Sequence, residues 1–202
     1  MRMTKIWILT LALLLGAPLA VASVSPTDMV KDTADRILTT FQENRADLEG
    51  KPEKIYRLVD EIVLPHFDFQ RMSQLVLGKY WRQASPEQRE RFTHEFRTLL
   101  VRTYSKALEQ YRDQTINYLP MRGDEQSGDV LVRTEVQQSD GYPIPIYYSL
   151  YLVEGQWKVY DVVIDNVSLV TNYRSSFASD IRKAGLDNLI ARLAERNQQN
   201  AQ

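Results

Sequence analysis

The spacing of apolar residues changes twice along this chain, and that change limits the folds it can adopt. Between residues 26 and 111 apolar side chains recur at steps of three and four, which indicates amphipathic helices. Between residues 116 and 165 they alternate at every second position, which indicates strands, and from residue 168 to 196 the helical spacing returns. Helices and strands segregated in this way predict an α+β fold, in which the helices pack on one side of an antiparallel sheet.

Capping signals mark the ends of the predicted helices. The clearest is Ser85, which is followed by Pro86 and, at the capping-box position, by Gln88. The apolar residues that follow predict one helix of about 25 residues, with a wide apolar face that favours packing against a sheet. Asp68 is the expected cap of an earlier helix, which Gly78 ends.

The middle of the chain has the pattern of consecutive hairpins. Ser139-Asp140-Gly141 is a hairpin turn signal, and Pro120 interrupts the first strand. We expect antiparallel strands at residues 116–121, 130–137, 142–153 and 157–165.

The first 22 residues have the pattern of a secretory signal peptide. Arg2 and Lys5 precede an uncharged stretch at residues 6–15, and Ala20-Val21-Ala22 is an A-x-A cleavage site. Pro18 interrupts the apolar stretch well before the roughly 20 residues that a transmembrane helix needs. We therefore expect cleavage after Ala22 and export to the periplasm. The remaining chain divides into one domain at residues 23–196 and a polar, frayed tail at 197–202.

Composition excludes several classes of function. Lys and Arg total 25 against 26 Asp and Glu, and the resulting net charge of −1 gives no electrostatic reason to bind nucleic acid. The absence of Cys excludes disulfides, thiolate catalysis and thiolate metal sites. His66 and His94 fall in different predicted helices and form no H-E-x-x-H motif, so we expect neither a metal site nor a cofactor.

The best candidates for catalysis are Tyr160, Asp161 and Asp165. In a regular strand Asp161 and Asp165 share one face about 13 Å apart. That separation exceeds the roughly 5–9.5 Å of a paired-carboxylate site. The chain also has no G-x-S-x-G, G-x-G-x-x-G or Walker A motif. Capping, turn or salt-bridge roles are therefore favoured for these residues, and the protein is not expected to be an enzyme.

The strand at residues 144–153 lacks the polar face of a half-solvated strand. One face carries Ile144, Ile146, Tyr148, Leu150 and Leu152, and the other carries Pro145, Tyr147, Ser149, Tyr151 and Val153. Two interpretations are open. The strand is either central and covered on both faces, or one of its faces lines an apolar cavity. Tyrosine suits a cavity mouth, because its ring is apolar while its hydroxyl needs a polar partner.

Three stretches in sequence order resemble the MlaC family, also called the toluene-tolerance auxiliary family. They are residues 75–82 (LVLGKYWR), residues 84–89 (ASPEQR) with Phe92, Phe96 and Thr103-Tyr104, and residues 157–162 (WKVYDV) with 167–170 and 172–174. The resemblance spans residues 26–195. Asn166 departs from the family pattern, which has Gly there, although Asn also tolerates a left-handed conformation.

The resemblance implies a monomeric periplasmic phospholipid carrier that maintains the lipid asymmetry of the outer membrane. Such a carrier shuttles glycerophospholipids between the two membranes. Its implied partners are an inner-membrane ABC lipid transporter complex and an outer-membrane lipoprotein–porin complex. The implied fold is a strongly curved sheet that encloses an apolar pocket with the helices, where the acyl tails lie with the head group outside.

Combining the periodicities with these motifs gives an expected set of tail-pocket residues. On the sheet side they are Val132, Ile146, Tyr148, Leu150 and Val163; on the helix side they are Leu77, Phe96, Leu99 and Leu100; near the mouth they are Val167 and Val170. Two alternatives remain open. One is a carrier of another hydrophobic ligand, such as a hopanoid or quinone, and the other is a small periplasmic enzyme with a cone-shaped α+β fold.

Overall fold

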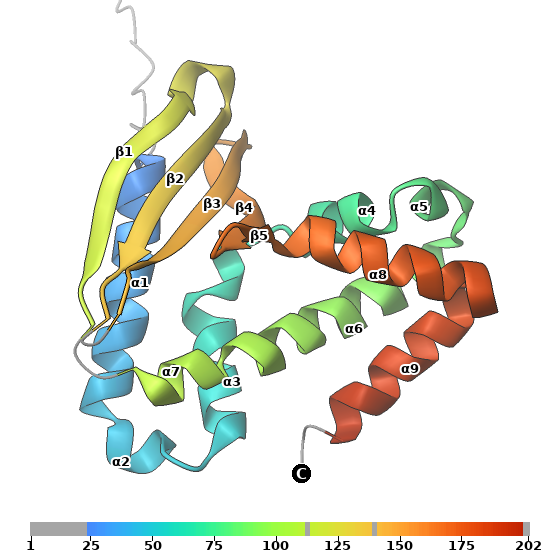
Figure 1. The fold of residues 1–202 in the computed structure, drawn as a ribbon, viewed down its shortest axis with the longest axis horizontal. Coiled ribbons are helices and arrows are strands. Elements are labelled where there is room, and N and C mark those ends of the chain that lie inside the picture. Colours follow the sequence, from blue (N-terminus) through green and yellow to red (C-terminus); the bar gives the residue numbers. More distant parts are fainter. Residues whose placement is uncertain (1–23, 112–113, 139–140, 200–202) are drawn as a thin grey trace, which may run out of the picture.

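The computed structural model describes residues 24–111, 114–138 and 141–199. The expected signal peptide and residues 139–140 of the predicted hairpin turn lie outside these ranges. Within them, helices come first, five strands follow, and two helices end the chain (Figure 1). The α+β arrangement expected from the apolar spacing is confirmed.

The strands form a single open sheet in the order β1-β2-β3-β4-β5, with every neighbouring pair antiparallel. Their bounds are β1 Ile116–Asp124, β2 Asp129–Val136, β3 Ile144–Val153, β4 Gln156–Ile164 and β5 Val167–Ser168, with a short 3-10 helix, η2, at Glu125–Ser127. The pairing of β1 with β2 shifts between Leu119 and Arg122, on either side of Pro120. Strand β5 was not predicted, because two residues are too few to show a period.

Three N-terminal helices precede the sheet in the chain, and the first of them lies along one of its faces. They are α1 Pro26–Glu43, α2 Arg45–Leu48 and α3 Pro52–Ile62, followed by the 3-10 helix η1 Leu64–His66. Helix α1 runs along the sheet behind β1 and β2 in Figure 1, and we call the face that it covers the inner face.

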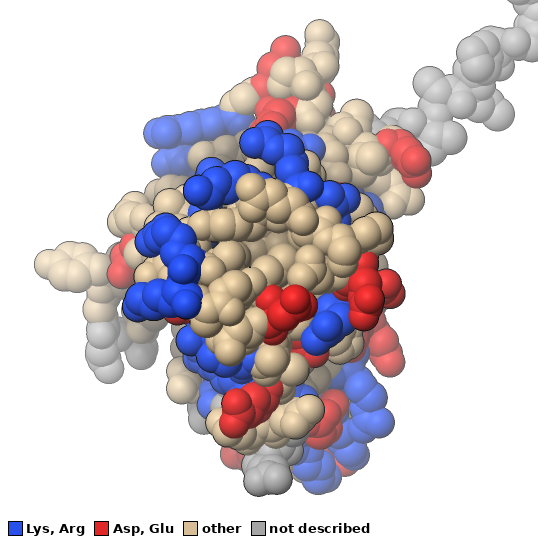
Figure 2. Space-filling model, turned by 90° about the vertical axis from the view of Figure 1, so that its right-hand side faces the viewer, with Lys and Arg blue, Asp and Glu red and all other residues tan. Residues whose placement is uncertain are grey.

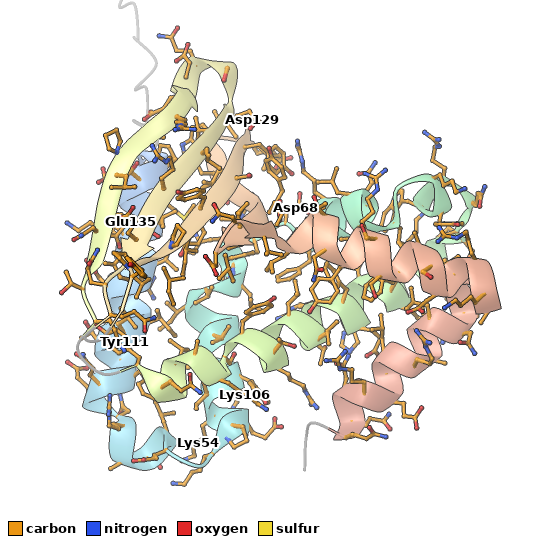
Figure 3. All side chains as sticks on the ribbon, in the orientation of Figure 1. Lys54, Asp68, Lys106, Tyr111, Asp129 and Glu135 are labelled. Atoms are coloured by element: carbon orange, nitrogen blue, oxygen red, sulfur yellow. The ribbon has the colours of Figure 1, made fainter. Side chains whose placement is uncertain are left out.

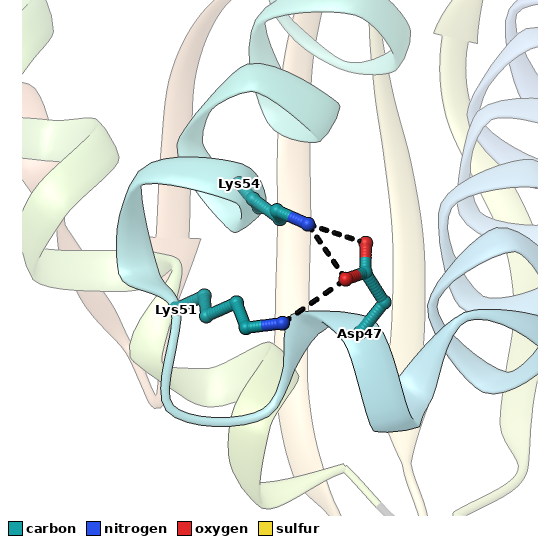
Figure 4. Close-up of polar contacts among 3 residues, drawn as sticks. All are labelled: Asp47, Lys51 and Lys54. Carbon is teal, nitrogen blue, oxygen red and sulfur yellow. Dashed lines mark hydrogen bonds and ion pairs between the residues drawn. The ribbon is translucent and has the colours of Figure 1, made fainter.

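A cluster of charges holds the turn between α2 and α3. The Asp47 carboxylate accepts hydrogen bonds from the ammonium of Lys54 at 2.6 Å and from that of Lys51 at 3.0 Å (Figure 4). These two bonds, that of Lys54 first, lower the pKa of Asp47. Because the Asp47 side chain is exposed, water screens the cluster, and it contributes little to stability.

The middle helices confirm the predicted caps and correct one length. They are α4 Phe69–Leu77, α5 Lys79–Gln83, α6 Pro86–Tyr104 and α7 Lys106–Gln110. Asp68 accepts a hydrogen bond from the Arg71 backbone at 2.8 Å, and Ser85 forms the complete capping box with Gln88. The predicted helix of about 25 residues is divided at Ser105. There the Leu108 amide bonds to the Ser105 carbonyl three residues back, which tightens the turn.

The last two helices are α8 Leu169–Ala184 and α9 Leu186–Gln199. Helix α9 continues past residue 196, where a frayed tail was expected to begin. Asn197 is only 4% exposed, and its side-chain amide donates to the Glu95 carbonyl at 2.9 Å. This contact with α6 explains why the final turn is ordered despite its polar sequence. No helix within the described ranges is long and apolar enough to cross a membrane.

The apolar core is divided into three clusters. The largest joins the inner face of the sheet to α4, α6, α8 and α9, and it contains the fully buried Phe92, Phe96 and Leu150. A second cluster joins α1 to α3 around Ile37, and a third surrounds Phe41. Helix α1 therefore packs partly within its own small cluster, beside the main core.

Candidate functional site

An apolar cavity of about 210 Å³ lies between α1 and the inner face of the sheet. Helix α1, the segment from Val63 to Phe67, and strands β1, β3 and β4 form its walls. The lining residues are Met29, Val30, Thr33, Ala34, Ile37, Leu38, Val63, His66, Phe67, Ile116, Tyr148 and Val159. These residues include no Lys, Arg, Asp or Glu. The lining therefore suits hydrocarbon rather than a charged ligand.

The three polar side chains in the cavity wall that could bear on its charge are Thr33, Tyr148 and His66. Thr33 donates its hydroxyl to the Met29 carbonyl at 2.7 Å, within its own helix. Burial raises the pKa of the Tyr148 phenol, so it stays protonated. Burial also lowers the pKa of His66, and the nearby cations Lys158 and Arg36 lower it further. At neutral pH the wall accordingly carries no formal charge.

The lowered pKa of His66 predicts a loss of stability in acid. Its pKa in the folded chain lies below the ordinary value of 6.5, so the unfolded chain takes up the proton more readily. The stabilising effect is therefore complete above pH 6.5 and is lost as the pH falls below it. Thermal unfolding at about pH 7 and pH 5 should show a smaller drop in midpoint for His66→Gln than for the wild type.

His94→Gln is the matched control for this prediction, since the chain has only two His. Its midpoint should fall with pH as the wild type does. If His66→Gln loses as much stability in acid as the wild type, His66 is not the responsible group.

Most residues expected to line a tail pocket lie in the main core. Seven of them belong to its largest cluster: Leu77, Phe96, Leu99, Leu100, Val132, Leu150 and Val170. Ile146 and Tyr148 pack against that cluster, and Tyr148 also lines the cavity. Val167 lies in β5 and is 51% exposed. The expected residues therefore belong mainly to one apolar core, and the small cavity lies beside it.

A bulge in β4 places Val163 away from this interior. Ser149 pairs with Asp161 whereas Leu150 pairs with Val159, so Tyr160 is an extra residue in β4. As a result Val159 and Val162 are both buried on the inner face, at 2% and 7% exposed. Val163 pairs with Tyr147 on the opposite, outer face. A strict period of two does not reveal such a shift, which explains why Val163 was predicted for this interior and Val162 was not.

The strand at residues 144–153 is covered on both faces, and part of its inner face also lines the cavity. On the inner face Tyr148 lines the cavity and Leu150 is fully buried in the core. On the outer face, guanidinium groups cover the tyrosine rings. Arg133 lies 5.4 Å from the Tyr147 ring centroid, and Arg71 lies 3.8 Å from that of Tyr151.

Two of the three candidates for catalysis, Tyr160 and Asp161, have structural partners, and the third, Asp165, donates its backbone amide to the Pro145 carbonyl at 3.0 Å. Asp161 accepts hydrogen bonds from the Ser168 hydroxyl at 2.6 Å and from the Val170 amide at 3.0 Å, so it caps the start of α8. Tyr160 donates to Asp129 at 3.0 Å. In the described part of the chain no three His, Asp or Glu side chains are placed to hold a metal ion.

Helix α1 forms a long wall of the cavity, but none of its residues was among those predicted to line a tail pocket. Its apolar stripe is visible in the sequence at Val30, Ala34, Ile37 and Leu38. Nothing in that stripe distinguishes a helix that faces a cavity from one that packs solidly. The helix was therefore predicted, but its place in the wall was not.

Together these features define an α+β protein with an open antiparallel sheet and an uncharged cavity beneath it. A family model described as MlaC protein matches residues 31–195. The chain belongs to the MlaC family, as its three motifs indicated.

Relatives of known name agree with this assignment. The intermembrane phospholipid transport system binding protein MlaC of Haemophilus influenzae is 29% identical over 201 residues, covering 95% of this chain and 92% of that protein. The toluene tolerance protein ttg2D of Pseudomonas putida is 30% identical over 179 residues, covering 88% of this chain and 83% of that protein. The first is named for phospholipid transport and the second for toluene tolerance.

A solved structure shares the fold. It is the phospholipid-binding protein from Ralstonia solanacearum in complex with a phospholipid. The two chains superpose with a TM-score of 0.82 at 35% sequence identity, covering 89% of this chain and 100% of that one.

Proposed function

We propose that this protein is a periplasmic phospholipid carrier that shuttles glycerophospholipids between the outer and inner membranes and so maintains outer-membrane lipid asymmetry. The observation that carries the proposal is the cavity beneath the sheet, whose lining includes no charged residue. Membership of the MlaC family and the phospholipid bound to the Ralstonia solanacearum relative support it.

The energetics of lipid transfer explain why such a carrier needs no catalytic group. Exposing one methylene to water costs about 0.8 kcal/mol, so a tail of about 15 methylenes costs on the order of 12 kcal/mol. A phospholipid therefore rarely leaves a bilayer unaided. An apolar interior lowers that barrier by replacing the bilayer around the tails.

The tail pocket in this proposal is larger than the cavity seen. At about 210 Å³ the cavity is smaller than the roughly 300–1,000 Å³ of typical ligand pockets. It lies where the main cluster, represented by Val30, meets the second cluster, represented by Ile37. Separating α1 from the core at this boundary enlarges it. The residues proposed for the walls of the enlarged pocket are Leu77, Phe96, Leu99, Leu100, Val132, Ile146, Tyr148, Leu150 and Val170, with Val167 at the mouth.

Val167→Arg is predicted to abolish phospholipid loading while leaving the fold intact. Val167 is 51% exposed, so the longer side chain fits without disturbing the core. A guanidinium at the proposed mouth opposes the passage of apolar tails. Lipid extracted from the purified variant is the measurement, and Tyr142→Arg is the control, because Tyr142 is 94% exposed on the β2–β3 loop. Wild-type amounts of lipid in Val167→Arg would remove Val167 from the site.

Carrier activity itself is tested by transfer of a fluorescent phospholipid between two vesicle populations. We expect the purified protein to accelerate transfer in proportion to its concentration. No acceleration at any protein concentration would contradict the carrier function. The lipid identified in the protein also separates a phospholipid carrier from one for hopanoids or quinones.

As a periplasmic carrier, the protein must be exported and must meet complexes at both membranes. We expect cleavage after Ala22, so the exported protein should begin at Ser23 when its N-terminus is sequenced. We expect a monomer that meets an inner-membrane ABC lipid transporter complex and an outer-membrane lipoprotein–porin complex in turn. Because a carrier only equilibrates its cargo, the net direction depends on the energy that a partner ATPase supplies.

A further inference from the structure

A second, polar hollow of about 730 Å³ opens on the side of the molecule away from α1. Helices α4, α5 and α8 and strand β3 contribute its walls. Four cations line it, namely Arg71, Lys79, Arg82 and Arg174, and its one carboxylate belongs to Asp68. Figure 2 shows the end of the molecule that carries α5 and the α8–α9 corner, where Lys and Arg gather over the upper half.

The one carboxylate in this hollow is already engaged. Asp68 lies at the start of α4 beside the sheet (Figure 3), where it accepts a hydrogen bond from the Arg71 backbone at 2.8 Å. It also accepts one from the Tyr151 hydroxyl. None of the four cations forms an ion pair with any residue that the structure describes. Because the whole chain has a net charge of −1, this local excess of positive charge is not a general property of the surface.

Aromatic rings hold the guanidinium of Arg71 in place. Its central carbon lies 3.8 Å from the ring centroid of Tyr151 and 4.5 Å from that of Tyr160. The two rings meet edge to face, and the Tyr160 hydroxyl donates to Asp129 at 3.0 Å. The Arg71 guanidinium is thus positioned by the Tyr151 and Tyr160 rings, which carry no formal charge to neutralise it.

The absence of a side chain at Gly78 lets the guanidinium of Arg174 lie against the corner between α4 and α5. Gly78 has a φ of +54°, and a Cβ added there would lie 3.1 Å from Arg174 Nη2. Any larger residue at position 78 would therefore displace this guanidinium as well as strain the backbone. The contact joins two of the sequence stretches that carry the family resemblance, residues 75–82 and 172–174.

We propose that this hollow binds a phosphate group, with Arg71 and Arg174 as its principal donors and Lys79 and Arg82 as additional charges. Planar guanidinium groups suit phosphate because they donate paired hydrogen bonds to its oxygens. The phosphate belongs either to the head group of a glycerophospholipid or to free inorganic phosphate. Binding of a lipid head group here rests on the proposed carrier function, whereas binding of free inorganic phosphate does not.

The test uses the full-length exported protein and the variant Arg174→Gln, with Arg182→Gln as the matched control. Arg182 lies on the same helix, is exposed, and is outside the hollow. Inorganic phosphate is titrated at constant ionic strength while backbone amide signals are followed by NMR. In parallel, the phosphorus resonance of lipid bound to each protein is recorded.

Binding of phosphate that Arg174→Gln weakens about tenfold or more, with Arg182→Gln unchanged, supports the inference. A change in the lipid phosphorus resonance confined to Arg174→Gln assigns the phosphate to the lipid head group. If that resonance is unchanged while the titration responds, free phosphate is the ligand. If neither readout distinguishes Arg174→Gln from the control, the inference is overturned, and the lipid mass still carried by the proteins decides the carrier proposal separately.

Discussion

Ala34→Trp should lose most of the phospholipid that copurifies with the wild-type protein. Ala34 lies on α1 and lines the cavity of about 210 Å³, which an indole would largely occupy. An indole displaces more than two methylenes of a tail, and each is worth about 0.8 kcal/mol, so loading should weaken by about tenfold or more. The lipid-bound fraction is read directly from native mass spectra of the two proteins.

Ala46→Trp is the control for this experiment, because Ala46 is exposed on the neighbouring helix α2. It should carry as much lipid as the wild type. If Ala34→Trp also carries wild-type amounts of lipid, then the space beneath α1 does not receive the tails, and the proposed pocket must lie elsewhere.

Phe96→Ala should produce a large loss of stability. The Phe96 ring is fully buried, stacks on Phe92 at 5.7 Å between centroids, and meets Tyr173 and Phe177 edge-on at 5.3 and 6.0 Å. Removing such a ring leaves a cavity and typically costs about 3–5 kcal/mol. That is a large share of the roughly 5–15 kcal/mol that stabilises a domain. Urea unfolding of the delipidated protein measures the difference.

Phe96→Leu is the conservative control, since it keeps most of the volume and should lose less stability. The comparison also tests the two roles of Phe96 separately. Wild-type stability in Phe96→Ala would contradict its role in the core, whereas a loss of lipid would support its proposed place in the pocket wall.

Local signals in the sequence predicted the helix ends well. Ser85 with Gln88 and Asp68 with Arg71 are caps made by residues three positions apart, so the chain itself contains both partners. The antiparallel strands were equally predictable, because alternation and turn residues are also local.

Features that depend on a distant partner were not predictable. The bulge at Tyr160 appears only when β4 is paired with β3, and it reverses the face on which Val163 lies. The final turn of α9 is held by the contact of Asn197 with Glu95. Likewise, the approach of Arg174 to Gly78 joins two stretches that were each recognised, but whose contact has no sequence signature.

The candidate site was only partly predictable for a different reason. Apolar residues that fill a core and apolar residues that line a cavity have the same pattern, so Leu99 and Ala34 cannot be told apart by periodicity. The sequence identified one apolar interior, of which Tyr148 is the residue that the cavity shares with the expected set.

The most direct test of the central claim is the mass of the native protein purified from a bacterial periplasm, followed by extraction of whatever it carries. The carrier account predicts a mass above that of the polypeptide, with the excess resolving into glycerophospholipids whose acyl chains can be counted. A mass equal to the polypeptide alone, unchanged after incubation with phospholipid vesicles, would contradict it.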